Sequence, residues 1–506
     1  MNGQRAKSAR LPTMVAAFAC LTIVGCGAVQ DIGPVDLLIT GARVMDPDSG
    51  LDAILNVAVR DGVIVAVTED TPEAHEVLDA SGLVVAPGFI DLHAHGQDPE
   101  SSRYQARDGV TTAMELEIGV YPVEDWYAAR EGLALIHFGA SVSHQGARRE
   151  AFGVMVAETD GEGIFTLGRG GGSDAYLYEP ASEDELRRIT QLMERELGQG
   201  ALGFGFGISY TPGASHEELL RLFGVAADRQ APVFIHLRSS GAFRAGGAIA
   251  PFQEVVANAA ATGASVHIVH MNSSAGQAAP AALELIRGAQ TRGIDVTTEA
   301  YPYTASASRI ESALFDGWTG RSPDAYARLQ WVETGERLTA DSFDRFREQG
   351  GWVITHGRSE DTNEWIVGQP DVIAASDGIP FSEGRAHPRG AGTFARILGR
   401  YVRERGVLSL MEGLRKMTLM PAQRLEAVAP QMASKGRVQV GADADLTLFD
   451  PDRVIDRATY DAPDQFSEGI LHVLVAGTFV VRNEALVDGV TPGHAITSVP
   501  VETRAH

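Results

Sequence analysis

The sequence predicts an α/β protein in which a parallel (β/α)8 barrel of the TIM type carries antiparallel strands from both ends of the chain. In the central part, short apolar runs alternate with longer amphipathic stretches, which is the pattern of repeated strand–helix units. Toward both ends, short runs of alternating polarity are broken by glycine and aspartate, as in antiparallel sheet. The chain has 506 residues, of which 44% are apolar and 21% charged. This balance supports a large core and excludes a disordered chain.

The first 25 residues have the features of a bacterial export signal. Arg5, Lys7 and Arg10 precede any acidic residue, and the apolar run over 11–25 is too short to cross a bilayer comfortably. The run ends in Ile-Val-Gly before Cys26, which resembles a lipobox. We therefore expect residues 1–25 to be removed and Cys26 to be lipidated, so that a lipid anchor alone holds the protein at the periplasmic face of a bacterial membrane. The alternative is an ordinary signal that yields a periplasmic or secreted protein.

Three segments are predicted after this leader. Residues 26–86 and 429–506 are predicted to form antiparallel strands, and residues 87–428 form the barrel. The eight candidate barrel strands are 85–95, 109–119, 133–144, 200–210, 231–239, 264–272, 294–303 and 370–378. The predicted helices are 182–197, 215–229, 279–293, 393–406 and 409–425. The first two begin with serine and an acidic residue within three positions, which is typical of a capping box.

Charge and cysteine content exclude two classes of protein. Lys and Arg total 42 against 66 Asp and Glu, which gives a formal net charge of −24. A field of this sign repels phosphate backbones, so no nucleic-acid partner is expected. The two cysteines, Cys20 and Cys26, cannot form a disulfide framework, and Cys20 would leave with the leader. The oligomeric state cannot be read from the sequence.

Polar side chains end five of the eight predicted strands, at the edge where barrels of this type carry their function. The first strand ends in two histidines that alternation places on one face, and the others end in single acidic or histidine residues. Imidazole and carboxylate ligands suit Zn²⁺, and so many buried polar groups would be costly without an ion. The sequence therefore predicts a metal site formed by His93, His95, Glu117, His236, His270 and Asp377.

Three further residues of ligand type lie close to these positions. Glu115 is the alternative to Glu117, because it lies on the same face of the second strand, and we prefer Glu117 because it is nearer the strand's end. His267 and His356 have no partner of matching register, so we expect them to be ordinary hydrogen-bonded residues.

Several motifs resemble those of one enzyme family. PGFIDLHAH (87–95) resembles the first metal motif of the amidohydrolase superfamily, and GVTT (109–112) fits the same superfamily. Within it, the chain most resembles the N-acyl-D-amino-acid deacylases, or D-aminoacylases. The matching segments are HLRSSG (236–241), YPYTAS (301–306), the long stretch 376–410 that begins SDGIPFSEG, KMTLMPAQRL (416–425) and GADADLTLFDP (441–451). The resemblance extends over residues 35–490, and the segment after Ser376 is its most diagnostic part.

The resemblance implies a distorted (β/α)8 barrel beside a small β-sandwich built from both chain ends. It also implies that His93 and His95 hold a more open metal position, and that His236 and His270 hold a tighter one. The sequence departs from the family at two points. The family's Gly-Asn-Cys-Gly segment reads Leu-Glu-Ile-Gly over 116–119, so Glu117 stands where the family offers cysteine and could bridge two ions. Asn272 occupies the position of a family lysine, so another group must bind a substrate carboxylate.

The predicted chemistry is hydrolysis by water activated on one or two zinc ions per chain. A bound Zn²⁺ polarises a carbonyl and lowers the pKa of its water to about 7. Asp377 would take the proton from that water and deliver it to the leaving amine. His144 or Tyr301 could donate a hydrogen bond to the developing oxyanion.

Four residues are candidates for binding the substrate. Arg148, Arg238 and Arg309 could hold its carboxylate, because a guanidinium matches a carboxylate with two parallel hydrogen bonds. Surface ion pairs are the alternative explanation for these arginines. Tyr303 lies in the tyrosine segment that matches the family and is the fourth candidate.

The predicted substrate is a small N-acyl-D-amino acid, of the kind taken by D-aminoacylases and D-glutamate deacylases, or a short peptide. Two alternatives lie in the same superfamily: a dipeptidase, and a hydrolase of cyclic amides such as hydantoins. The second is disfavoured because no strand lysine suited to carboxylation is present. A non-catalytic lipoprotein that holds metal is a third alternative, which the presence of Asp377 argues against, because binding alone needs no base.

Overall fold

The computed structural model describes residues 33–154, 174–238 and 248–499. The predicted leader, Cys20 and the predicted lipidation site Cys26 lie outside these residues. Within the described part of the chain, no helix has the length and apolar character needed to cross a membrane.

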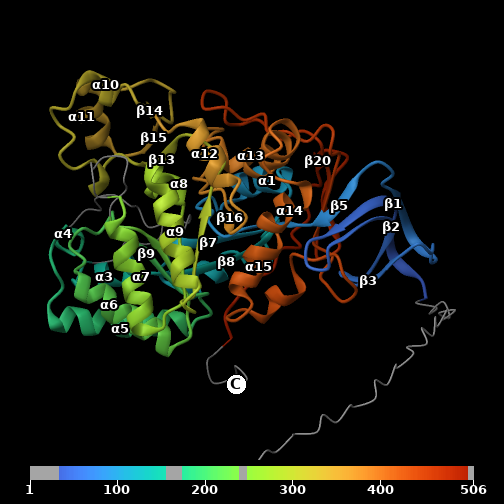
Figure 1. The fold of residues 1–506 in the computed structure, drawn as a ribbon, viewed down its shortest axis with the longest axis horizontal. Coiled ribbons are helices and arrows are strands. Elements are labelled where there is room, and N and C mark those ends of the chain that lie inside the picture. Colours follow the sequence, from blue (N-terminus) through green and yellow to red (C-terminus); the bar gives the residue numbers. More distant parts are fainter. Residues whose placement is uncertain (1–32, 155–173, 239–247, 500–506) are drawn as a thin grey trace, which may run out of the picture.

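Eight parallel strands form the predicted barrel (Figure 1). They pair in chain order, and every predicted strand overlaps one of them. The strands are β6 (Phe89–Asp91), β7 (Val110–Val120), β8 (His137–Ser143), β9 (Phe204–Gly207), β10 (Val233–His236), β11 (Val266–Ile268), β12 (Val296–Ala300) and β16 (Val372–Ala374). A parallel bridge from Ala94 to Gly378 links the residues that follow the first and last strands, so the barrel is nearly closed there.

Helices cover the outside of the barrel and confirm the predicted ones. The long helices are α5 (Glu183–Leu197), α6 (His216–Asp228), α7 (Ala250–Thr262) and α9 (Ala279–Gln290), and the closing helices are α13 (Arg389–Arg396), η4 (Ile397–Glu404), α14 (Leu410–Met417) and α15 (Leu419–Leu425). Shorter ones are α1 (Pro99–Arg107), α2 (Val123–Ala128), α3 (His144–Ala151), α4 (Ala175–Tyr178), α8 (Met271–Ser274), η2 (Gly276–Ala278), α12 (Glu360–Val367) and η5 (Pro430–Ser434). The predicted capping box begins α5, where Ser182 and Glu185 exchange hydrogen bonds with each other's backbone. At α6, the Ser215 side chain accepts from the Glu218 backbone N–H.

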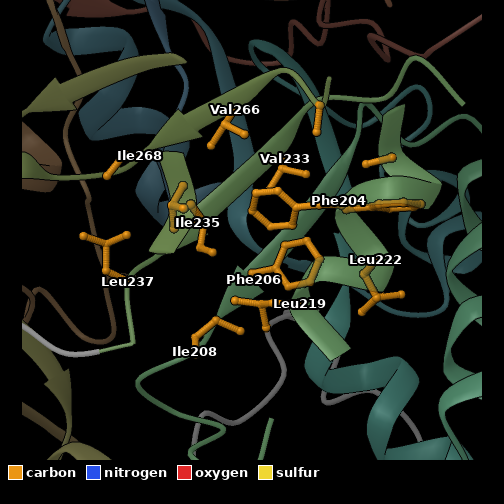
Figure 2. Close-up of a cluster of buried hydrophobic side chains, with 14 of the residues drawn as sticks. Phe204, Phe206, Ile208, Leu219, Leu222, Val233, Ile235, Leu237, Val266 and Ile268 are labelled. Carbon is orange, nitrogen blue, oxygen red and sulfur yellow. The ribbon is translucent and has the colours of Figure 1, made fainter. Parts of the chain in front are cut away.

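Strand alternation decides which side chains face the interior of the barrel. Figure 2 shows Phe204, Val233 and Val266 from three barrel strands in a cluster of buried side chains that also contains Leu219 and Leu222 of α6. Their neighbours in sequence point the opposite way, because successive side chains of a strand alternate. Phe234 accordingly packs with the residues inside the barrel, and His236 and His267 share its face.

The two ends of the chain together form one sheet of nine strands. Its strands are β1 (Val35–Asp46), β2 (Leu51–Arg60), β3 (Val63–Thr68), β4 (Ala74–Asp79), β5 (Val84–Pro87), β17 (Leu446–Phe449), β18 (Ile470–Val475), β19 (Thr478–Arg482) and β20 (Ala485–Leu486). β17 pairs antiparallel with β5, which joins the C-terminal strands to the N-terminal ones. The predicted antiparallel pattern holds except at β1, which pairs in parallel with β4 and β5. The segment boundaries at 86 and 428 remain predictions.

A small subdomain that the sequence analysis did not anticipate is inserted between β12 and β16. Its antiparallel strands are β13 (Ser306–Arg309), β14 (Leu329–Trp331) and β15 (Trp352–Thr355), and its helices are η3 (Ala313–Phe315), α10 (Pro323–Tyr326) and α11 (Ala340–Gln349). It has its own aromatic core, in which Trp331 stacks on Phe346 with ring centroids 4.2 Å apart. In Figure 1 the subdomain projects beside the barrel at the upper left.

Candidate metal centre

The six predicted ligands meet at the carboxyl ends of the barrel strands. They form two groups, His93–His95–Glu117–Asp377 and Glu117–His236–His270, and within each group the ligand atoms all lie within 4.8 Å of one another. All six residues are buried. The side chains come from β6, β7, β10, β11 and β16 or the residues that follow them, so the fold brings together residues almost 300 positions apart.

Glu117 belongs to both groups and divides its two oxygens between them. Its Oε2 lies 3.2 Å from Nε2 of His93 and 3.2 Å from Nε2 of His95. Its Oε1 lies 2.7 Å from Nδ1 of His236 and 2.8 Å from Nε2 of His270. This is the placement needed for a carboxylate that bridges two ions. The prediction preferred Glu117 to Glu115, and the geometry agrees with that preference.

Carboxylates behind the first two histidines orient their rings. Glu299 Oε1 lies 2.5 Å from His93 Nδ1, and Glu115 Oε2 lies 2.8 Å from His95 Nδ1. When Nδ1 donates to a carboxylate, the lone pair of Nε2 is left for a metal. Glu115 is therefore a partner of a ligand, which fits its place two residues before Glu117.

Glu299 in turn forms a hydrogen bond with His267. Its second oxygen, Oε2, lies 2.9 Å from His267 Nε2, and His267 Nδ1 lies 2.8 Å from the Thr297 hydroxyl. Burial lowers the pKa of His267 despite the neighbouring Glu299, so its imidazole is neutral and donates from Nε2. His267 and His356 are hydrogen-bonded as predicted, and His356 contacts Gln330 far from the ligands. The sequence analysis did not single out Glu299.

The electrostatics of the cluster favour a cation. Burial opposes charge on His93 and His95, but Glu117, Asp377, Glu115 and Glu299 outweigh it and raise the pKa of both imidazoles well above the ordinary value. Burial likewise opposes the charge on Glu117, but the histidines hold its pKa well below the ordinary value. A field that favours a proton on these imidazoles also favours a divalent cation among them. The donor set of four imidazoles and two carboxylates is one that zinc and similar ions take.

Asp377 is placed by the backbone and by a buried arginine. Its φ is +53°, an uncommon conformation for a residue with a side chain, and its N–H donates to the His93 carbonyl over 2.7 Å. Its Oδ1 lies 3.4 Å from His93 Nε2, and its Oδ2 lies 2.8 Å from Arg389 Nη1. The Arg389 contact is ionic, because the guanidinium is not aligned for a hydrogen bond. Burial raises the pKa of Asp377, but Arg389 and His93 outweigh it and lower the pKa, so the carboxylate is ionised.

A cavity opens over the cluster, with His95, Glu117, His236, His270 and Asp377 among its lining residues. Its walls come from the inserted subdomain and from the residues that follow β9 and β11. The wall residues are Tyr210, Ser273, Ser306, Ala307, Ser308, Leu314, Phe315, Trp318, Trp352 and Thr355.

Tyr210 is a wall residue that the sequence analysis missed. Its ring centroid lies 4.9 Å from that of His236, and its hydroxyl lies 3.4 Å from the Ser308 hydroxyl. Burial and the charge of Glu117 raise the pKa of Tyr210 well above its ordinary value, so the phenol stays protonated. Tyr210 is the last residue of the fourth predicted strand, the same position that identified the metal ligands, so the signal was present in the sequence.

The predicted carboxylate-binding arginines lie elsewhere, each beside a glutamate. Nη1 of Arg148 lies 2.5 Å from Glu218, which also contacts His144 at 2.7 Å. Arg238 pairs with Glu254 at 2.9 Å, and Nε of Arg309 pairs with Glu311 at 2.8 Å. These residues do not line the cavity, and all three arginines form ion pairs. The expectation of a surface ion pair is wrong for Arg148, because its pair with Glu218 is buried.

Tyr301 and Tyr303 are buried behind the cavity wall. The Tyr301 hydroxyl accepts from Arg358 over 2.8 Å, and its ring lies beneath the Arg389 guanidinium at 4.7 Å. The Tyr303 hydroxyl donates to Asp456 over 3.2 Å. Neither tyrosine lines the cavity, although Tyr301 supports Arg389 next to Asp377.

A family model described as "Amidohydrolase family" matches residues 76–481. The chain belongs to the amidohydrolase family. It is 31% identical over 468 residues to the N-acyl-D-glutamate deacylase of Alcaligenes xylosoxydans xylosoxydans, a match that covers 88% of this chain and 93% of that protein. It is 28% identical over 487 residues to the D-aminoacylase of the same organism, with 90% of this chain and 96% of that protein covered.

A solved structure extends this relationship to the fold. The N-acyl-D-glutamate deacylase of Bordetella bronchiseptica, crystallised with zinc and a phosphonate inhibitor that mimics the tetrahedral intermediate, matches this amidohydrolase with a TM-score of 0.76 and 27% identity. The match covers 92% of this chain and 100% of that one. This amidohydrolase is thus a metal-dependent hydrolase of carbon–nitrogen bonds in linear amides, and the cluster is a group of residues that could hold its metal.

Proposed function

We propose that this amidohydrolase cleaves the amide bond of N-acyl-D-amino acids and releases a carboxylate and a free D-amino acid. The observation that carries the proposal is the position of Asp377, an ionised carboxylate beside the shared ligand Glu117 and at the floor of a cavity. A site that only held metal would not need this carboxylate to be exposed to the cavity. The relatives named above act on substrates of this class.

The chemistry can be divided between the ion and the chain. A bound divalent ion, for which we propose zinc, supplies a polarised amide carbonyl and a water of low pKa. Asp377 takes a proton from the attacking water and delivers it to the leaving nitrogen. The Arg389 guanidinium lies beside Oδ2 of Asp377 and keeps this carboxylate ionised between the two transfers.

Tyr210 is the donor best placed to stabilise the oxyanion. It lines the cavity beside His236, and its phenol is protonated, so its hydroxyl can donate as negative charge develops on the carbonyl oxygen. His144 and Tyr301, which were the sequence-based candidates, do not line the cavity. We therefore assign this role to Tyr210.

Glu117 allows two ions per chain. One oxygen faces His93 and His95 and the other faces His236 and His270, so each ion would have two imidazoles and one carboxylate oxygen. Asp377 adds a ligand on the side of His93 and His95. We infer that the ion near Asp377 is the one beside which water is activated.

The proposal is tested with protein stripped by a chelator, reloaded with zinc and given N-acetyl and N-formyl derivatives of D- and L-amino acids. Release of free D-amino acids is expected. In Asp377→Asn, release should fall by about 10²- to 10⁴-fold while zinc remains bound at the Glu117–His236–His270 group. Asp371→Asn is the matched control, because Asp371 pairs with Arg287 outside the site and its loss should leave the rate unchanged.

The other outcomes identify the alternatives. Hydrolysis of dipeptides or cyclic amides in preference to N-acyl-D-amino acids would assign the chain to one of those classes. A zinc-loaded protein that hydrolyses none of these amides would be a metal-holding protein, and the proposal would be wrong.

We further propose that the protein is exported and anchored by acyl chains on Cys26. The support is the sequence of the first 26 residues, in which a basic start and a short apolar run precede the cysteine. Labelled fatty acid should be incorporated into the wild-type chain in a bacterial host and not into Cys26→Ser. Equal labelling of both would contradict lipidation at this cysteine.

A further inference from the structure

The wall of the cavity opposite the metal ligands is built by the inserted subdomain and is aromatic. Phe315 is the last residue of the short helix η3, and Trp318 follows this helix. Trp352 is the first residue of β15. Leu314 stands beside them, and Phe315 and Trp318 pack with ring centroids 5.3 Å apart. The remaining wall residues carry neutral hydroxyl groups or a methyl group. A substrate group that leaves the metal centre in this direction therefore meets apolar and aromatic surface.

No lysine or arginine is among the described residues that line this cavity. Two arginines lie near its tryptophans without reaching the lining. Arg309 is 5.7 Å from the Trp352 ring centroid and is ion-paired with Glu311, and Arg321 is 4.4 Å from the Trp318 ring centroid. A carboxylate placed against Leu314 and Phe315 would lose its hydration without gaining a salt bridge, which is unfavourable. An aromatic or aliphatic group placed there would gain apolar contact and ring stacking.

We propose that the substrate side chain recognised by this wall is aromatic or aliphatic, and that this amidohydrolase discriminates against N-acyl-D-glutamate and N-acyl-D-aspartate. The inference rests on the proposed function, because it concerns the amino-acid part of that substrate. It separates this chain from the N-acyl-D-glutamate deacylase to which it is 31% identical. Leu314, Phe315, Trp318 and Trp352 are the specificity-determining residues.

The test compares kcat/KM of the zinc-loaded enzyme for the N-acetyl derivatives of D-phenylalanine, D-leucine, D-glutamate and D-aspartate. The two apolar substrates are expected to exceed the two acidic ones by at least about tenfold. Equal values, or a preference for D-glutamate, would overturn the inference and leave the proposed deacylase activity standing. Fluorescence of Trp318 and Trp352 gives a second readout, in which N-acetyl-D-leucine should change the emission at lower concentration than N-acetyl-D-glutamate. This titration decides the inference even if no substrate is hydrolysed, in which case only the proposed function fails.

A charge placed in the wall should reverse the preference. Leu314 is half-buried and its side chain reaches the cavity, so Leu314→Arg places a cation in this wall. The ratio of kcat/KM for D-glutamate over D-leucine is expected to rise by at least about tenfold in this variant. Leu220→Arg, on the exposed side of α6 with the Leu220 side chain 43% exposed, is the matched control and should leave the ratio unchanged. A ratio that stays constant in Leu314→Arg would contradict a role for this wall in specificity.

Discussion

Glu299 Oε1 lies 2.5 Å from His93 Nδ1, and this contact fixes which nitrogen of His93 faces the metal position. The other oxygen of Glu299 receives His267, whose second nitrogen contacts Thr297. The three residues form a line of polar groups inside an otherwise apolar barrel, ending on a metal ligand. Burial opposes the charge on Glu299, but His93 and His267 lower its pKa, so the carboxylate is ionised and accepts from both imidazoles.

Replacing Glu299 should weaken metal binding without unfolding the protein. In Glu299→Gln, one carbonyl oxygen must serve two imidazole donors, and the amide turns its NH₂ group toward one of them. The expected loss is about 10- to 100-fold in zinc affinity, measured by competition with a chromophoric chelator. Glu196→Gln is the matched control, since Glu196 is a buried glutamate that accepts from the Val123 N–H and lies outside the metal site. Zinc affinity that is unchanged in Glu299→Gln and in His267→Phe would show that this line of residues does not position His93.

Glu117→Gln and Glu115→Gln should differ in the number of zinc ions that each variant binds. Glu117 contacts all four histidines, so Glu117→Gln is expected to reduce zinc to at most one ion per chain. The Glu115 carboxylate hydrogen-bonds to His95 alone among the candidate ligands, so Glu115→Gln should keep the stoichiometry and lower the affinity by about tenfold. Elemental analysis of both variants after the same reloading measures this difference. Equal metal content in the two would contradict a shared ligand at Glu117.

The Tyr210 hydroxyl should contribute to turnover rather than to substrate binding. Removing a hydrogen bond that strengthens only in the transition state lowers kcat, so Tyr210→Phe is expected to lower kcat by about 10- to 100-fold with KM nearly constant. Tyr127→Phe removes a buried hydroxyl on the far side of the β8 strand and serves as control. A tenfold rise in KM at constant kcat would instead show that the hydroxyl contributes to binding of the substrate in its ground state.

The buried cluster around Glu218 predicts a pH-dependent stability that is separate from catalysis. Burial raises the pKa of Glu218, but His144 and Arg148 outweigh it and lower the pKa to about 2 from 4.5. The unfolded chain therefore binds a proton at higher pH than the folded protein does. The stabilisation, on the order of 3 kcal/mol, is complete above pH 4.5 and is lost as the pH falls toward 2. The difference in free energy of unfolding between wild type and Glu218→Gln should shrink between pH 7 and pH 3.5 in urea titrations. A difference independent of pH would contradict the lowered pKa.

The barrel and its ligands could be predicted because both follow from local patterns. Five of the eight apolar runs end in residues of ligand type, and a parallel barrel brings all strand ends to one edge, so His93 and Asp377 could be paired without knowing any distance. The same reasoning would have found Tyr210, which ends the fourth run. The family resemblance alone implied that both chain ends build one β domain, and it implied a sandwich rather than the single nine-stranded sheet.

The other residues that were missed depend on contacts that no local pattern encodes. Glu299 lies within a strand rather than at its end, and its importance comes from the register that places it beside His267 and His93. Arg389 lies on a helix, twelve residues beyond Asp377. Only the tertiary structure brings it into contact with that carboxylate. Arg148, Arg238 and Arg309 were predicted from their chemistry alone, and each lies beside a glutamate that sequence could not pair with it.

The most direct test of the central claim is anomalous diffraction at the zinc absorption edge from crystals of the zinc-loaded protein. The account predicts anomalous peaks within coordination distance of His93, His95, Glu117 and Asp377 and of Glu117, His236 and His270, with Glu117 bound to both if two ions are present. Full zinc loading with no peak among these side chains, or with peaks only at other residues, would contradict it.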